Sequence, residues 1–147
     1  MSPVLSEILA LHEEVANPWE AGGMAAYMKD IAPFYGIKAP PRKALQKEII
    51  KHYANLPPQE WTDLLRALYA QPQRELHYLA MDWLYFRRKQ YTPQSIELIE
   101  EMIATKSWWD TVDFLSSRCL GEWAARFPPV GVLGSGPPGF QLRQNPS

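Results

Sequence analysis

The sequence predicts an all-α protein built as an α-solenoid of antiparallel helix pairs. Apolar residues recur at spacings of three and four over residues 1–127, and no segment alternates as a half-buried strand would. Prolines separate segments of about 12 to 18 residues, a length suited to helix hairpins. Two such hairpins, residues 57–90 and 92–127, share a layout typical of HEAT-like or ARM-like repeats.

Helical segments follow one another along the chain. Ser2 is placed to cap the first helix and Pro3 suits its first position, while Asn17 and Pro18 are expected to end it. Thr92 is expected to cap the sixth helix. A turn region that includes Gly36 separates the second and third helices. The expected helices are residues 2–17, 20–32, 40–56, 57–72, 73–91, 92–105 and 107–127. The apolar stripes expected to face the core include Val4, Ile8, Leu11 and Val15, and Trp61, Leu64, Leu65 and Leu68.

The composition changes abruptly after Phe127. Residues 128–147 hold five prolines, four glycines and one charged residue, so we expect a disordered tail after a helical domain of residues 1–127. A solenoid normally ends in a capping repeat, and none follows the last helix. The chain therefore reads as truncated, and we expect the apolar face of residues 107–127 to be exposed and prone to association.

The bulk composition is that of a cytoplasmic, monomeric protein that does not enter a membrane. No apolar run approaches the roughly 18 residues of a membrane span, and the first residues lack the pattern of a signal peptide. The single cysteine, Cys119, excludes an intrachain disulfide. Net charge is −1, but residues 29–51 carry six basic and two acidic residues. This segment suits docking to a polyanion, although a solvated helix face would have the same composition.

The stretch "TKSWWDTVD", residues 105–113, divides between two faces of a helix. Ser107 and Asp110 have the spacing of a capping box, and Trp108 lies on the stripe that faces the core. Trp109 and Asp113 share the other, polar face. Burial does not explain this second pair. It fits either a functional site or a tryptophan covered by a neighbouring helix, with its aspartate paired to a lysine.

An indole beside a carboxylate suits a substrate that is cationic or becomes so in the transition state. Cleavage of a glycosidic bond passes through an oxocarbenium-like state, and a positively charged alkylated purine needs no separate proton donor to leave. A static cation-binding or partner-binding patch is the alternative. His12, His52 and His77 lack metal-ligand spacing, so we expect no metal and no cofactor. Cys119 lies on the core stripe and is expected to be buried and inert.

Three stretches carry a resemblance to a known family: "TKSWWDTVD", "MAAYMKDIAPFYGIKAPPRK" and "RELHYLAMDWL". They resemble the AlkD family of DNA alkylation-repair glycosylases, over about residues 1–127, which corresponds to the N-terminal half of a family member. The resemblance implies a solenoid of HEAT-like repeats with a concave basic face that binds duplex DNA. It also implies release of N3- and N7-alkylated purines by hydrolysis of the N-glycosidic bond, without a metal.

The resemblance assigns roles to individual residues. Trp109 and Asp113 match the catalytic aromatic and carboxylate of the family. Tyr27 matches an aromatic that approaches the DNA near the lesion. The family contacts the duplex backbone at the positions of Lys38 and Lys43, and the same assignment extends to the DNA-binding candidate Arg42, which lies between them.

The sequence departs from the family in its second half. The resemblance implies a C-terminal half that supplies a second aromatic wall and a catalytic-site arginine, and nothing here matches them. Two alternatives therefore stand beside an active glycosylase. One is a non-catalytic helical-repeat module that binds DNA or protein, and the other is a structural fragment with no function of its own.

Overall fold

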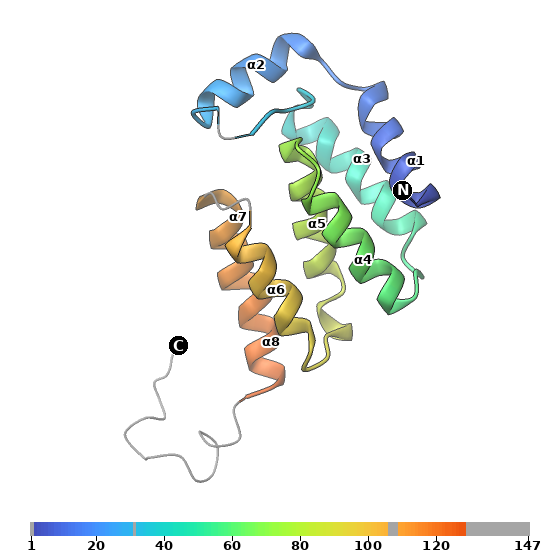
Figure 1. The fold of residues 1–147 in the computed structure, drawn as a ribbon, viewed down its shortest axis with the longest axis vertical. Coiled ribbons are helices and arrows are strands. Elements are labelled where there is room, and N and C mark those ends of the chain that lie inside the picture. Colours follow the sequence, from blue (N-terminus) through green and yellow to red (C-terminus); the bar gives the residue numbers. More distant parts are fainter. Residues whose placement is uncertain (1, 31, 106–108, 129–147) are drawn as a thin grey trace.

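The computed structural model describes residues 2–30, 32–105 and 109–128, and of Trp109 only the backbone. All regular secondary structure among these residues is helical, with no strand (Figure 1). The helices are α1 (Pro3–Glu14), α2 (Pro18–Tyr27), α3 (Ala39–His52), α4 (Pro58–Tyr69), α5 (Arg74–Phe86), α6 (Ser95–Ala104), α7 (Trp109–Phe114) and α8 (Gly121–Arg126). A 3₁₀ turn, η1, covers Arg88–Gln90. The tail predicted over residues 128–147 lies outside the described residues beyond Pro128.

The helix predicted over residues 107–127 continues without a break through its described part. A π-helical segment, η2 (Leu115–Leu120), joins α7 to α8. The joining residues Phe114, Leu120 and Gly121 all keep right-handed helical dihedral angles. A π segment is one wide turn inserted into an α-helix. The predicted helix is therefore confirmed over its described residues.

The described helices pack around a central α5. Helix α4 packs along α5, and α6 packs along η2, which in turn contacts α5 (Figure 1). All four residues of the predicted α4 stripe are buried. Helix α5 contributes several side chains with no exposed surface: Leu76, Leu79, Ala80, Trp83 and Leu84. The core thus lies along α5.

The Asn17–Pro18 step begins α2, while α1 ends earlier than predicted, at Glu14. As predicted, the Ser2 hydroxyl accepts a hydrogen bond from the Leu5 N–H at 3.1 Å and caps α1. The Asn17 side chain accepts one from the Trp19 N–H at 3.0 Å, so it caps α2 at the residue where sequence reasoning saw only a stop. Helix α2 is therefore residues 18–27 and not 20–32, and it is followed by left-handed backbone at Asp30.

Helix α1 turns a different residue inward from the one predicted. Val15 is 47% exposed, whereas His12 is fully buried. His12 Nδ1 donates to the Ile8 carbonyl at 2.8 Å, and its Nε2 accepts from Gln46 Nε2 at 3.1 Å. Burial lowers the pKa of His12 and favours the neutral ring that this bonding requires. Of the expected stripe, Ile8 is buried and Val4 and Leu11 pack against the core, but His12 takes the place expected for Val15.

The start of α6 lies two residues later than predicted. Thr92 was expected to cap it with Pro93 at the first position, but the helix begins at Ser95. The Thr92 N–H donates to the Ser95 hydroxyl at 2.9 Å, and the Ser95 N–H donates to the Thr92 carbonyl. These bonds close a turn before the helix. Trp123 of α8 anchors the same turn, because its Nε1 donates to the Thr92 carbonyl at 3.0 Å.

The expected apolar face at residues 107–127 is not exposed in its described part. The large apolar side chains there are at least partly buried against the core: Phe114, Leu115, Leu120, Trp123 and Phe127. The exposed positions of residues 110–126 are small or polar: Asp113, Ser116, Ser117, Arg118, Gly121, Ala124, Ala125 and Arg126. The expectation was wrong because the helix turns its single apolar side against α5 and α6. No described helix is both long and apolar enough to cross a membrane.

The turn before α3 depends on a buried carboxylate. Glu75, which is fully buried at the start of α5, accepts hydrogen bonds from the N–H groups of Tyr35, Gly36 and Ile37 at 2.9, 3.0 and 3.1 Å. Gly36 has a φ of +93°, and a Cβ atom there would overlap the Asn17 carbonyl oxygen. Only glycine fits, because it tolerates both this φ and this close approach.

Replacing Gly36 by alanine should therefore destabilise the protein by about 1–3 kcal/mol. The matched control is Gly22→Ala in α2, where an added Cβ has no neighbour within 4 Å and alanine favours the helix by about 0.5–1 kcal/mol. Urea unfolding of both variants measures the two changes. Equal effects of the two substitutions would contradict this account of the turn.

Candidate functional site

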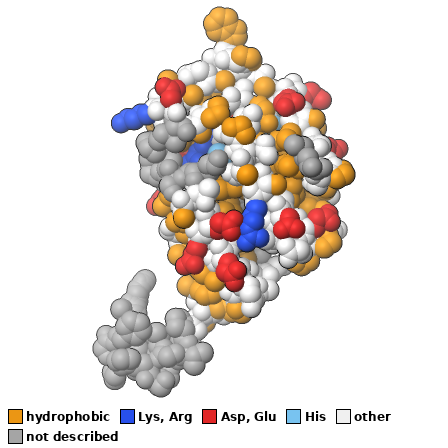
Figure 2. Space-filling view, viewed as in Figure 1, with side chains coloured by type: hydrophobic (Ala, Val, Ile, Leu, Met, Phe, Trp, Pro, Cys, Tyr) orange, Lys and Arg blue, Asp and Glu red, His pale blue; other side chains and the backbone are white. Residues whose placement is uncertain are grey.

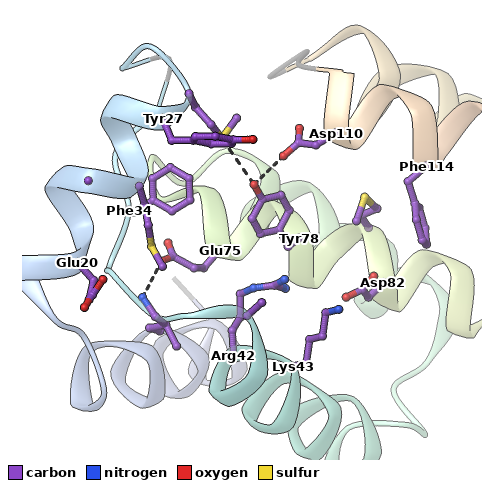
Figure 3. Close-up of a pocket in the computed structure, with 16 residues that line it drawn as sticks. Glu20, Tyr27, Phe34, Arg42, Lys43, Glu75, Tyr78, Asp82, Asp110 and Phe114 are labelled. Atoms are coloured by element: carbon purple, nitrogen blue, oxygen red, sulfur yellow. Dashed lines mark hydrogen bonds between the residues drawn. The ribbon is translucent and has the colours of Figure 1, made fainter.

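A cavity of about 670 Å³ lies between α2 and the helices α3, α5 and α7 (Figure 3). In the close-up, Arg42 and Lys43 point up into it from α3, while Tyr27, Tyr78 and Asp110 line its opposite side. Such a lining, apolar and aromatic with a few convergent polar groups, is typical of ligand sites. The lining residues are Glu20, Gly23, Met24, Tyr27, Met28, Phe34, Ile37, Ala39, Arg42, Lys43, Glu75, Tyr78, Met81, Asp82, Asp110 and Phe114.

Asp110 is held from α5 at both of its oxygens. Its Oδ1 accepts from Arg74 Nη2 at 2.6 Å and from the Thr111 N–H at 2.7 Å. Its Oδ2 accepts from the Tyr78 hydroxyl at 2.6 Å. The bond from Thr111 agrees with the predicted position near the start of a helix, but Ser107 lies outside the described residues. The sequence did not predict the contacts of Asp110 with Arg74 and Tyr78. They link α7 to α5.

Arg74 is the buried partner in this network. Its side chain is 1% exposed, and besides Asp110 its Nη2 reaches the Thr111 hydroxyl at 2.8 Å. Its backbone N–H donates to the Pro33 carbonyl at 2.9 Å. An ion pair removed from water in this way is costly to break, because the remaining charge stays buried. Arg74 thus ties α7 and the turn before α3 to the start of α5.

The Tyr78 ring lies in reach of two guanidinium groups. The Cζ atom of Arg42 is 4.6 Å from the ring centroid and that of Arg74 is 5.5 Å away, both within the range of a cation–π contact. Burial raises the pKa of Tyr78, and the hydrogen bond to Asp110 raises it further, so the hydroxyl stays protonated as a donor. Burial lowers the pKa of Arg42, which also donates to Gln46 Oε1 at 3.0 Å.

A second, basic groove of about 510 Å³ continues from the cavity. The two share Lys43, Asp82 and Phe114. Burial raises the pKa of Asp82, while Arg42 and Lys43 act in the opposite direction. We call this second space the α3–α5 groove; it is lined by Lys43, Gln46, Lys47, Ile50, Lys51, Asp82, Tyr85, Phe86, Arg88 and Phe114. Four of these side chains are basic and one is acidic, so the groove favours an anion.

Acidic side chains gather on another part of the surface. The face shown in Figure 2 carries them over α4 and α6. The exposed acids of these two helices are Glu60, Asp63, Glu97, Glu100 and Glu101. Charge is therefore separated on a molecule whose net charge is only −1, with the basic groove on α3 and α5.

The structure brings together some of the residues singled out from the sequence. Tyr27, which is 82% exposed, lines the cavity with Arg42 and Lys43. Lys38 lies outside the lining and forms an exposed ion pair with Glu20, at 3.5 Å. Asp113 is exposed and also lies outside the lining. Trp109 begins α7, and its side chain is outside the described residues, as is Trp108.

Sequence reasoning missed Arg74, Glu75, Tyr78 and Asp82 as site residues. All four lie on α5, which reads as a strongly apolar helix. One signal was available: Tyr78 and Asp82 are one turn apart and so share a face, and a polar face on an otherwise buried helix needs partners. Cys119 behaves as predicted, since it is fully buried and burial raises its pKa to about 12. Over the described residues, no group of three His, Cys, Asp or Glu side chains could hold a metal ion.

These features define a class: an all-helical protein with an aromatic and acidic cavity that opens onto a basic groove. Comparison with known proteins gives the family. The profile of the DNA alkylation repair enzyme family matches residues 8–130, and the chain belongs to that family. A solved structure titled as a predicted DNA alkylation repair enzyme from Enterococcus faecalis is 32% identical, with a TM-score of 0.69. The match covers 76% of this chain and 52% of that one, so the chain spans about half of its relative. No curated protein matches the sequence.

The buried ion pair of Arg74 should dominate the stability of the site. We expect Arg74→Met to lower the free energy of unfolding by about 3–5 kcal/mol, because Asp110 loses its cation while remaining partly buried. Arg66→Met is the matched control. Arg66 also pairs with a carboxylate, Glu101 at 3.1 Å, but on the exposed surface, where such pairs contribute about 0–1 kcal/mol. Chemical denaturation measures both, and similar losses would contradict the role of Arg74.

Proposed function

We propose that this chain acts in the repair of alkylated duplex DNA, as a glycosylase that hydrolyses the N-glycosidic bond of cationic N3- or N7-alkylated purines. The observation that carries the proposal is the junction of the two cavities. The α3–α5 groove and the aromatic cavity share Lys43, Asp82 and Phe114. In this proposal the α3–α5 groove would bind the phosphates of the duplex, and the adjoining cavity would accept the cationic base. Membership of the DNA alkylation repair enzyme family supports the same reading.

The groove has the spacing that a nucleic-acid backbone requires. Lys43, Lys47 and Lys51 lie one turn apart along α3, so their attachment points are separated by about 6 Å, close to the distance between successive phosphates. Arg88 faces them from η1 beyond the end of α5. The packing of α4 on α5 and of α6 on η2 supports a HEAT-like solenoid as part of this proposal. In this proposal its inner face carries α3, α5 and α7.

The chemistry is assigned to the helix that borders both cavities. Asp113 would stabilise the oxocarbenium-like sugar and orient the attacking water, and Trp109 would stabilise the cationic base through its ring. The alkylated purine would leave as a neutral base, and water would give its hydroxyl group to the sugar and its remaining proton to Asp113 or the solvent, so the proposed reaction requires no metal. Asp113 is exposed, and so accessible to a bound duplex. Tyr27 would meet the DNA from α2 at the mouth of the cavity, where it is also exposed.

A second candidate is a non-catalytic module that binds DNA. The charge of the α3–α5 groove favours it, because four basic side chains and one acidic one suit a DNA backbone whether or not a base is released. Such a module would use the groove through Lys43 and the adjoining cavity through Arg42. Binding and release of the base therefore need separate measurements.

The test is release of 7-methylguanine from duplex DNA by the whole chain, at enzyme concentrations that saturate the substrate. We expect release by the unmodified protein and a loss of about 10²- to 10³-fold in Asp113→Asn, because the sugar cation loses its carboxylate. The control is Asp63→Asn, an exposed aspartate on the acidic face, which should leave release unchanged. Salt-sensitive DNA binding without release would support the binding module instead. The absence of both DNA binding and base release would contradict both candidate functions.

A further inference from the structure

Tyr78 lies where four helices meet. Its hydroxyl donates to Asp110 of α7 at 2.6 Å, and Met28, at the end of α2, places its sulfur 3.6 Å from the same oxygen. Its ring supports the Arg42 guanidinium of α3, 4.6 Å from the centroid. Figure 3 shows Tyr78 between Arg42 below and Asp110 above. One side chain of α5 therefore contacts both a proposed DNA-binding residue and the helix that carries the proposed catalytic residues.

The contact with Asp110 determines how α7 is oriented. Asp110 lies in the first turn of α7, one residue after Trp109 and three before Asp113. One carboxylate oxygen is held by Arg74 and the other by Tyr78. A carboxylate bound at both oxygens from a buried neighbouring helix cannot rotate without breaking a charge-assisted hydrogen bond. The orientation of the first turn of α7, which leads to Asp113, is thereby tied to α5.

We propose that Tyr78 is a positioning residue with two separable roles, which rests on the proposed glycosylase function. Its hydroxyl orients α7, and with it the proposed catalytic residue Asp113, toward the sugar–base bond. Its ring holds the Arg42 guanidinium in place for the DNA. Catalytic groups must be held to within about 0.5 Å of their working geometry, so loss of the hydroxyl slows the reaction without weakening binding.

A positioning role and a purely stabilising role of the Tyr78 hydroxyl predict different rates of base release. Tyr91 offers the comparison, because its buried hydroxyl donates to the Leu84 carbonyl of α5 at 3.0 Å and lies beside Cys119 of η2. Loss of either hydroxyl removes a buried hydrogen bond and lowers stability, by more at Tyr78 because its partner is a carboxylate. Of the two tyrosines, only Tyr78 contacts Asp110 at the start of α7. A structural role alone predicts that the folded fraction of both variants releases base at the same rate.

The experiment compares Tyr78→Phe, Tyr78→Leu and Tyr91→Phe in single-turnover release of 7-methylguanine from duplex DNA, with the folded fraction checked by circular dichroism. Tyr78→Phe keeps the ring, so we expect DNA affinity to stay as in the unmodified protein while release slows by about ten- to a hundredfold. Tyr78→Leu removes the support of Arg42 as well, and should lose both affinity and rate. Tyr91→Phe should change neither.

The possible outcomes distinguish the positioning role of Tyr78 from the proposed glycosylase function. Release by Tyr78→Phe at the rate of the unmodified protein would overturn the positioning role and leave the glycosylase proposal standing. A drop in affinity that accounts for the whole loss of rate in Tyr78→Phe would also overturn it, because the hydroxyl would then act on binding. Absence of release by the unmodified protein would overturn the proposed function, and the positioning role with it.

Discussion

Two adjacent charged side chains, Arg74 and Glu75, are buried in the first turn of α5, and the rest of the structure is arranged around them. Each would be expensive to bury alone, and each is compensated by a different part of the chain. Arg74 pairs with Asp110 and fixes the start of α7. Glu75 accepts three backbone N–H groups from the turn before α3. Segments far apart in the sequence are thus joined at one turn of one helix.

This constraint explains where the cavity lies. The turn held by Glu75 separates α2 from α3, and its glycine brings the backbone against the Asn17 carbonyl, so α2 is set beside the core and not within it. Helix α2 itself contributes no buried residue. The space left between α2, α3, α5 and α7 is the aromatic cavity. Its acidic and basic groups then follow from the helices that surround it, with Arg42 and Lys43 from α3 and Asp110 from α7.

The fold could be predicted from the sequence because its signals are local. Helical spacing, proline breaks and the Ser2 cap each depend on a few neighbouring residues, and each helix that they predict is present in its described part. Boundaries failed at Asn17, which caps α2 while α1 ends at Glu14, and the α1 stripe failed at Val15, because His12 faces the core instead. The site was harder. Tyr27, Arg42 and Lys43 were found through the resemblance, but Arg74, Glu75 and Tyr78 act through partners more than 30 residues away. Spacing along a single helix does not reveal such partners.

The account rests most directly on the claim that DNA lies along the α3–α5 groove. Acetylation of lysines by a water-soluble reagent, read by mass spectrometry with and without duplex DNA that contains 7-methylguanine, tests it residue by residue. The account predicts that DNA slows modification of Lys43, Lys47 and Lys51, which line the groove, while the exposed Lys89 outside it stays reactive. Groove lysines that remain as reactive as Lys89 in the presence of saturating DNA would contradict it.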